Sequence, residues 1–330
     1  MNIRTLLWDA AKPGSKKALP ILSFPAAQKL GVSVETLVKS AELQARAMEV
    51  IARDTATVAA VSLMDLSVEA EAFGAQVRFS EHEVPAVIGQ LISGEDDADA
   101  LAVPGMDAGR ASLCVDAVRM AKESITDKPV IAGMIGPYSL AGRLCDVTEI
   151  MYLCFDEPET VHTVLDKATA YLIRYGQAMK AAGADGVMVA EPLAGILSPE
   201  MAGEFSMPYM KRLIDALQDE DFAVLYHNCG NSVPQMLGSI YALGAAAFHF
   251  GNAIDMEAVM KATPADVLVM GNIDPAGEFA GGTVESITAA TRDLLDKCGS
   301  YPNFVPSSGC DIPAHARWEN ILAFFKAVEG

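Results

Sequence analysis

The stretch Phe222-Ala223-Val224-Leu225-Tyr226-His227-Asn228-Cys229-Gly230 is the most informative part of this chain. Its first five residues are apolar, which is typical of a buried β-strand, so His227 and Cys229 are expected where that strand ends. Residues two apart on a strand point to the same side, so this imidazole and this thiolate can hold one ion together. Further on, Ser307-Ser308-Gly309-Cys310 supplies a third ligand in Cys310.

The set of His227, Cys229 and Cys310 predicts a zinc site, because imidazole and thiolate are ligands that zinc prefers. Three protein ligands leave a fourth position open, which distinguishes a zinc that takes part in chemistry from a structural one. On spacing alone, a second interpretation stays open. In that interpretation His227 is a hydrogen-bonded core histidine and the cysteines are ordinary buried thiols.

The composition indicates an ordered, acidic protein. The 330 residues are 51% hydrophobic, and 24 Lys+Arg against 43 Asp+Glu give a net charge of -19. Such a surface repels phosphate backbones and anionic lipids, so we expect neither nucleic acid nor a membrane surface as a partner. Solubility alone is a sufficient reason for the charge.

The sequence predicts a cytoplasmic protein. Residues Met1 to Lys17 contain too short an apolar stretch for a signal peptide, and no run of 18 uncharged apolar residues predicts a transmembrane helix. In the cytosol the six cysteines stay reduced, so Cys229 and Cys310 are better interpreted as ligands than as a disulfide. The other four are expected in the core: Cys114, Cys145, Cys154 and Cys298.

Apolar runs alternate with helical patterns along the chain. The eight expected strands are Leu19 to Phe24, Val58 to Leu63, Pro129 to Met134, Gly186 to Ala190, Phe222 to Tyr226, Ala245 to Phe250, Val267 to Met270 and Asn303 to Pro306. This alternation predicts an α/β fold, a single (β/α)8 TIM barrel over residues 1–330. We expect an N-terminal extension before it and a loop insertion from Glu81 to Asp107, which is either a lid or an insertion without a function.

In such barrels the working residues lie at the C-terminal ends of the strands. The three zinc-ligand candidates fall there, and so do four further residues: Asp65, Glu191, His249 and Asp274. Glu191 is a resting fourth zinc ligand or, as we favour, a hydrogen-bond partner of a ligand. His249 contacts substrate or is a core histidine, and Asp274 reacts or caps its loop. Asp65 is a catalytic candidate whose role is open.

Five stretches of this chain resemble the uroporphyrinogen decarboxylase superfamily, and the similarity extends over nearly all its length. They are Val68 to Gly74, Ile135 to Gly142, Leu197 to Glu200, Pro208 to Lys211 and Gly271 to Pro275. Within the superfamily, His227, Cys229 and Cys310 resemble the zinc motif of the corrinoid-dependent methyltransferases of the methylcobalamin:coenzyme M type.

This resemblance implies a zinc-dependent methyltransferase that moves a methyl group from a methylated corrinoid to a thiol such as coenzyme M. The donor would be carried by a small corrinoid protein that docks over the barrel mouth, and an oligomer is possible. The resemblance also makes Gly136, Asn272 and Asp274 candidates for binding the corrinoid cofactor, and His249 a candidate for corrinoid or substrate.

Two other functions are weighed against this one: a uroporphyrinogen decarboxylase and a non-catalytic zinc- or corrinoid-binding relative. True decarboxylases resemble one another in an arginine-rich segment after the first strand. Here the corresponding stretch, Ser23 to Val34, has Lys29 as its only cation. Together with the charge of -19, this departure argues against a substrate that bears many carboxylates.

Overall fold

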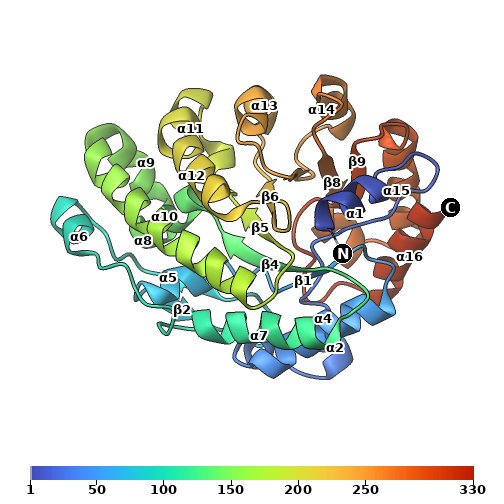
Figure 1. Cartoon of the computed structure of the whole chain (residues 1–330), viewed down its shortest axis with the longest axis horizontal. Helices are drawn as coiled ribbons and strands as arrows, with labels where there is room; N and C mark the ends of the chain where they lie inside the picture. Colours follow the sequence, from blue (N-terminus) through green and yellow to red (C-terminus); the bar gives the residue numbers. More distant parts are fainter. Residues whose placement is uncertain (1) are drawn as a thin grey trace.

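Seven parallel strands form one curved sheet in this computed structural model, which describes residues 2–330. In sheet order they are β1 (Ala60–Val61), β4 (Val130–Ile135), β5 (Gly186–Ala190), β6 (Ala223–Asn228), β7 (Ala247–Phe250), β8 (Val269–Ile273) and β9 (Phe304–Ser308). A separate antiparallel pair consists of β2 (Gln76–Arg78) and β3 (Ala86–Ile88). Helices surround the sheet on its outer side (Figure 1).

The helices follow the strands in the alternation that the sequence predicts. In chain order they are α1 (Ile3–Ala10), α2 (Ala26–Leu30), α3 (Val34–Val38), α4 (Ala41–Asp54), α5 (Val68–Ala72), α6 (Glu95–Ala100), α7 (Ala111–Ser124), α8 (Pro137–Cys145), α9 (Val147–Asp156), α10 (Pro158–Ala181), η1 (Leu193–Ile196), α11 (Pro199–Phe205), α12 (Met207–Leu217), α13 (Val233–Tyr241), α14 (Met256–Ala262), η2 (Pro275–Ala280), α15 (Val284–Cys298) and α16 (Trp318–Glu329). None of these helices is long and apolar enough to cross a membrane.

The first expected strand, Leu19 to Phe24, is not a regular strand, and that prediction is wrong in detail. Instead, residues 18–21 connect the two edges of the curved sheet by single hydrogen bonds. The Val58 N–H donates to the Ala18 carbonyl over 3.0 Å, and the Leu19 N–H donates to the Pro306 carbonyl over 3.1 Å. Pro20 has no N–H to continue a ladder, so the barrel closes here without a full eighth strand.

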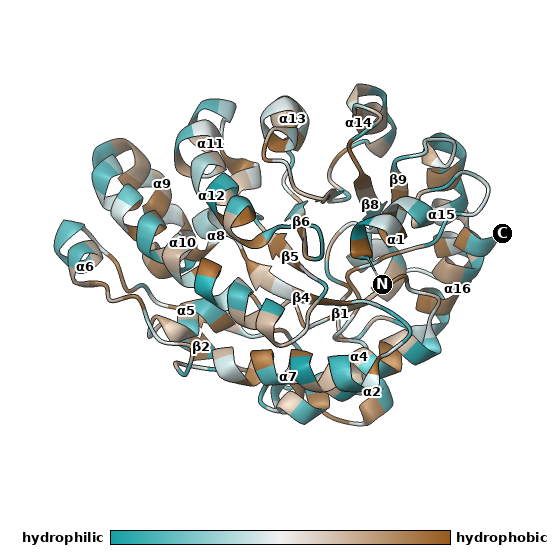
Figure 2. Cartoon of the chain, viewed as in Figure 1, coloured by the Kyte–Doolittle hydropathy of each residue, from teal (hydrophilic) through white to brown (hydrophobic). Residues whose placement is uncertain are grey.

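Two apolar cores lie on the two sides of the sheet. Residues 223 and 225 of β6 belong to the core inside the barrel, whereas 224 and 226 belong to the core beneath the helices. The period of two in a strand therefore puts His227 on the inner side. The N-terminal helix α1 contributes Ile3 and Leu7 to the inner core. Figure 2 shows the apolar strands and the polar outward sides of the helices.

The segment from Glu81 to Asp107 is more regular than expected, because it includes β3 and α6. It is fastened along the outer surface of α10, where Lys167 Nζ donates to the carbonyls of Ala98 and Asp99 over 2.6 and 2.8 Å. Arg174 donates to the Pro104 carbonyl over 3.0 Å. These bonds hold the segment against a helix, so the structure gives no support to the lid interpretation.

Candidate metal centre

The register of the strands brings two histidines together inside the barrel. His227 of β6 and His249 of β7 are partners in the parallel ladder. Both alternate with residues that face the outer helices, so both point into the barrel. His227 is 2% exposed and His249 is fully buried.

Cys229 and Cys310 join His227 to form a compact group of ligand atoms. One ligand atom from each of the three residues lies within 4.8 Å of the other two, and Cys310 Sγ lies 3.5 Å from His227 Nε2. Cys229 follows β6 directly, and Cys310 follows β9 by two residues. One imidazole and two thiols in this arrangement fit the ligand chemistry of zinc.

The two sulfurs are electrostatically coupled. A hydrogen bond from Cys310 lowers the pKa of Cys229 to about 7. The same bond, together with burial, raises the pKa of Cys310 to about 12. Without an ion, Cys229 is therefore the more readily ionised of the two sulfurs, and Cys310 keeps its proton at neutral pH. Metal binding has to displace that proton, because the thiolate is the ligand.

A glycine allows the end of β7 to lie directly against Cys229. A Cβ at Gly251 would be 2.6 Å from both the Cα and the Cβ of Cys229. Any side chain there would force Cys229 or the main chain at residue 251 to move. The absence of a side chain at residue 251 is thus a requirement of the cluster geometry.

His249 lies inside the barrel, where it continues a chain of hydrogen bonds that begins at His227. His227 Nδ1 lies 2.8 Å from His249 Nδ1, and His249 Nε2 lies 2.7 Å from Ser307 Oγ. Ser307 Oγ donates to the Leu19 carbonyl over 2.7 Å. Burial, and then the neighbouring His227, lower the pKa of His249 well below its usual value. Of the two interpretations of His249, this placement matches the core histidine.

The side chain of Glu191 accepts hydrogen bonds from the first turn of α8, the helix that follows β4. Its buried carboxylate accepts a hydrogen bond from the Tyr138 N–H over 2.9 Å and longer ones from the Ser139 N–H and hydroxyl, both over 3.3 Å. Burial raises the pKa of Glu191 to about 8. A Cβ at Gly136 would lie 2.0 Å from Glu191 Oε1, so this glycine makes room for the carboxylate. The hydrogen bond between Glu191 and a zinc-ligand candidate comes from the main chain, where the Glu191 N–H donates to the His227 carbonyl over 2.8 Å.

Asp65 forms a buried ion pair that the sequence did not reveal. Arg110 donates to Asp65 Oδ2 over 2.5 Å and to Glu71 Oε2 over 2.6 Å. Ser67 donates to Asp65 Oδ1 from both its N–H and its hydroxyl, over 3.1 and 2.6 Å. Burial alone would lower the pKa of Arg110, but Asp65 and Glu71 outweigh it and raise that pKa. Asp65 thus has a structural partner for each carboxylate oxygen.

Asn272 and Asp274 organise the loops after β7 and β8. The Asn272 amide donates to the carbonyls of Gly251 and Ile254 over 2.9 and 3.1 Å. Asp274 Oδ1 accepts from the N–H groups of Ala276 and Gly277 at the start of η2, both over 2.9 Å. Asp274 therefore caps its loop, which is one of its two expected roles. Corrinoid binding by Gly136, Asn272 or Asp274 stays a prediction.

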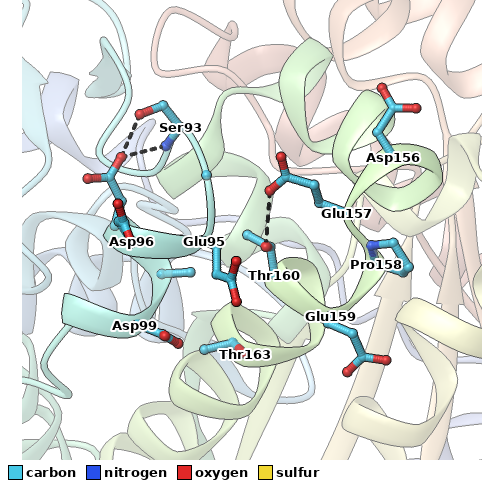
Figure 3. Close-up of a pocket in the computed structure, with 13 residues that line it drawn as sticks. Ser93, Glu95, Asp96, Asp99, Asp156, Glu157, Pro158, Glu159, Thr160 and Thr163 are labelled. Atoms are coloured by element: carbon cyan, nitrogen blue, oxygen red, sulfur yellow. Dashed lines mark hydrogen bonds between the residues drawn. The ribbon is translucent and has the colours of Figure 1, made fainter.

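A hollow of about 800 Å³ on the outer surface lies between α6 and the start of α10 and is separate from this cluster. Acidic residues predominate in its lining: Glu95, Asp96, Asp97, Asp99, Asp156, Glu157 and Glu159. Figure 3 shows this hollow, with all of these acidic side chains labelled except Asp97, and the hydrogen bond from Thr160 to Glu157, which measures 3.2 Å. Among residues 2–330, no histidine or cysteine lines the hollow.

Comparison with known proteins relates the chain to two kinds of enzyme. A methylcobamide:CoM methyltransferase, MtbA, from Methanosarcina mazei is 29% identical over 236 residues, which are 70% of this chain and 69% of the relative. A uroporphyrinogen decarboxylase from Xylella fastidiosa is 27% identical over 342 residues, which cover 99% of this chain and 94% of the relative.

The fold has a close structural counterpart. A methyltransferase from Methanosarcina mazei superposes with a TM-score of 0.87 at 23% identity, covering 99% of this chain and 98% of its own. Residues 17–330 match the sequence profile described as Uroporphyrinogen decarboxylase (URO-D). This match covers far more than half of the chain, and the chain belongs to the uroporphyrinogen decarboxylase family.

Proposed function

We propose that this protein transfers a methyl group from a methylated corrinoid to a small thiol, using zinc held by His227, Cys229 and Cys310. The observation that carries the proposal is the convergence of these three ligand atoms within 4.8 Å at the C-terminal ends of β6 and β9. In a barrel of this kind, that end is where reactants bind. The similarity to the methylcobamide:CoM methyltransferase supports the same reaction class.

The chain supplies a ligand set whose charge suits this chemistry. Cys229 and Cys310 contribute two negative charges as thiolates, and His227 contributes a neutral nitrogen. When bound, zinc supplies a Lewis acid that keeps an incoming thiol deprotonated at neutral pH. Because the two thiolates already balance the charge of the ion, the acceptor sulfur stays electron-rich and nucleophilic.

In the proposed reaction the acceptor sulfur forms a bond to the methyl carbon as the bond from carbon to cobalt breaks. The electron pair of that broken bond stays on cobalt, which is thereby reduced by two electrons, and the thiol proton is released. The protein has to hold the sulfur close to the methyl group and keep water away. We propose a small corrinoid protein as the carrier of the donor.

Decarboxylation of uroporphyrinogen is the competing function, and the decarboxylases among the relatives favour it. The cations of this chain argue against it. Arg110 is occupied by Asp65 and Glu71. Lys29, the only cation of the Ser23 to Val34 stretch, lies 4.6 Å over the Trp318 ring and 3.7 Å from an oxygen of Asp54. Arg110 is thus already paired inside the protein, and Lys29 is a single cation that Asp54 partly neutralises, too little charge for a substrate with many carboxylates.

Metal analysis and a thiol screen test the proposal. With zinc and a suitable thiol, the protein should remove the methyl group from methylcobalamin, and Cys310→Ala should abolish both this reaction and zinc retention. Cys298→Ala is the matched control, because Cys298 is fully buried and lies outside the cluster. If Cys310→Ala keeps full zinc and full rate, the proposal is wrong. Uroporphyrinogen decarboxylation that survives removal of zinc would favour the competing function.

A further inference from the structure

We propose that His249 and Ser307 are positioning residues that fix the tautomer of His227, so that Nε2 offers its lone pair to the metal. This inference rests on the zinc site of the proposed function. It concerns four groups joined by hydrogen bonds: the His227 ring, the His249 ring, the Ser307 hydroxyl and the Leu19 carbonyl. The direction of every hydrogen bond in this chain follows from its last member.

The Leu19 carbonyl can only accept a hydrogen bond. Ser307 has one hydroxyl proton, which it donates to this carbonyl over 2.7 Å. Ser307 Oγ must then accept from its other neighbour, His249 Nε2, at 2.7 Å. The proton of His249 is therefore on Nε2.

With its proton on Nε2, a neutral His249 has a lone pair on Nδ1. None of the described residues places a carboxylate within 4.0 Å of His249, and the side chain is fully buried, so a charged imidazole would have no counter-ion here. His249 Nδ1 lies 2.8 Å from His227 Nδ1 and has to accept its proton. His227 is thereby protonated on Nδ1.

The consequence appears on the other side of the His227 ring. Its Nε2 carries the lone pair and lies 3.5 Å from Cys310 Sγ, on the side of the cysteine ligands. A metal-bound histidine usually donates its second N–H to a carboxylate or a carbonyl, which orients the ring. In this chain another histidine has that role, and it is oriented in turn by Ser307.

The tautomers can be observed directly in the zinc-free protein. The chain has five histidines, namely His82, His162, His227, His249 and His315. Long-range 1H–15N correlation on protein labelled at histidine separates Nδ1–H from Nε2–H rings. We expect an Nδ1–H ring for His227 and an Nε2–H ring for His249, assigned by loss of each signal in its variant. An Nε2–H ring at His227 overturns the proposal.

Two variants of nearly the same shape separate hydrogen bonding from packing. In His249→Asn the amide oxygen is bonded to Cγ, as Nδ1 is, and can accept the His227 proton, whereas His249→Leu has no acceptor. We expect His249→Leu to weaken zinc binding about ten- to a hundredfold in competition with a chelator. His249→Asn should recover most of that loss. Equal zinc affinity in the two variants overturns the proposal.

Ser307→Ala tests the far end of the chain, with Ser308→Ala as its matched control. Ser308 is the next residue of β9, and its hydroxyl accepts from the Ile21 N–H over 3.1 Å, whereas the hydroxyl that lies 2.7 Å from His249 Nε2 is that of Ser307. Only Ser307→Ala should convert part of the His249 signal to the other tautomer, and an unchanged His249 spectrum in that variant contradicts its role. These readouts need neither thiol nor corrinoid. They therefore test the tautomer even if the protein proves not to transfer methyl groups.

Discussion

Replacing Arg110 with methionine tests whether the ion pair at Asp65 is structural. The substitution keeps most of the apolar stem of Arg110 and removes its guanidinium. The side chains of Arg110 and Asp65 are 9% and 3% exposed, and their closest atoms lie 2.5 Å apart. Arg110→Met therefore leaves a carboxylate inside the protein without its counter-ion.

The loss of stability in Arg110→Met depends on which hydrogen-bond partners Asp65 and Glu71 still have in the variant. Removing one member of a buried ion pair costs about 3–5 kcal/mol of the free energy of unfolding. Asp65 keeps the two donors of Ser67, which offset part of that cost. Glu71, at 23% exposure, can take up water. We therefore expect a loss of about 3 kcal/mol, at the low end of the range.

A double variant supplies the control. Asp65→Asn with Arg110→Met removes both charges and leaves an oxygen that can accept from Ser67, so we expect it to lose only about 1 kcal/mol. Urea unfolding measures both losses as shifts of the midpoint at constant slope. If the single variant loses no more than the double variant, Asp65 does not depend on Arg110 as described.

The same double variant decides whether Asp65 is a catalytic residue. If the role of Asp65 is structural, the double variant should keep zinc-dependent demethylation of methylcobalamin close to the wild-type rate. If Asp65 acts on the substrate, the rate falls although stability is largely recovered. The two measurements separate the two interpretations because one reports folding and the other reports chemistry.

Three further predictions concern other parts of the barrel. Burial raises the pKa of Glu69 to about 7 from 4.5, so the folded state holds a proton between these pH values that the unfolded state releases. Stability should fall by up to about 3 kcal/mol as pH rises through this window, and Glu69→Gln should flatten the curve of unfolding free energy against pH. Gly251→Ala should displace Cys229 and lower the zinc content, as measured by metal analysis, while a variant that binds zinc normally would contradict the close contact. Leu7→Ala should cost about 2–5 kcal/mol in urea unfolding because α1 fills the inner core, and a loss below 1 kcal/mol would contradict that packing.

The inward direction of His227 could be predicted from sequence because it depends on a local rule. Alternate residues of a strand face opposite sides, and the apolar run before His227 makes the strand recognisable. The approach of Cys310 followed from the barrel fold, since the C-terminal ends of parallel strands meet at one face. The grouping of the three ligand atoms within 4.8 Å agrees with both inferences.

The partners of the other candidates could not be predicted, because they depend on register and on distant segments. Arg110 lies 45 residues from Asp65, and no local pattern connects them. The contact between His227 and His249 requires the register of β6 on β7, which apolar patterning alone does not determine. Helix α6, by contrast, could have been predicted from a local pattern. Acidic residues stabilise a helix N-terminus, and Glu95, Asp96 and Asp97 stand in its first turn.

The candidates at the C-terminal ends of the strands differ in whether their bonding capacity is already used. The carboxylate of Asp65 is paired with Arg110 and Ser67, that of Glu191 accepts from the start of α8, and that of Asp274 accepts from the start of η2. A group whose partners are all supplied by the protein is part of the scaffold. In the His227 group, by contrast, one ligand atom of each of the three residues lies within 4.8 Å of the other two, and Cys310 Sγ lies 3.5 Å from His227 Nε2. This is the group at which an ion with an open coordination position would gain most, and it is why we assign the chemistry to it.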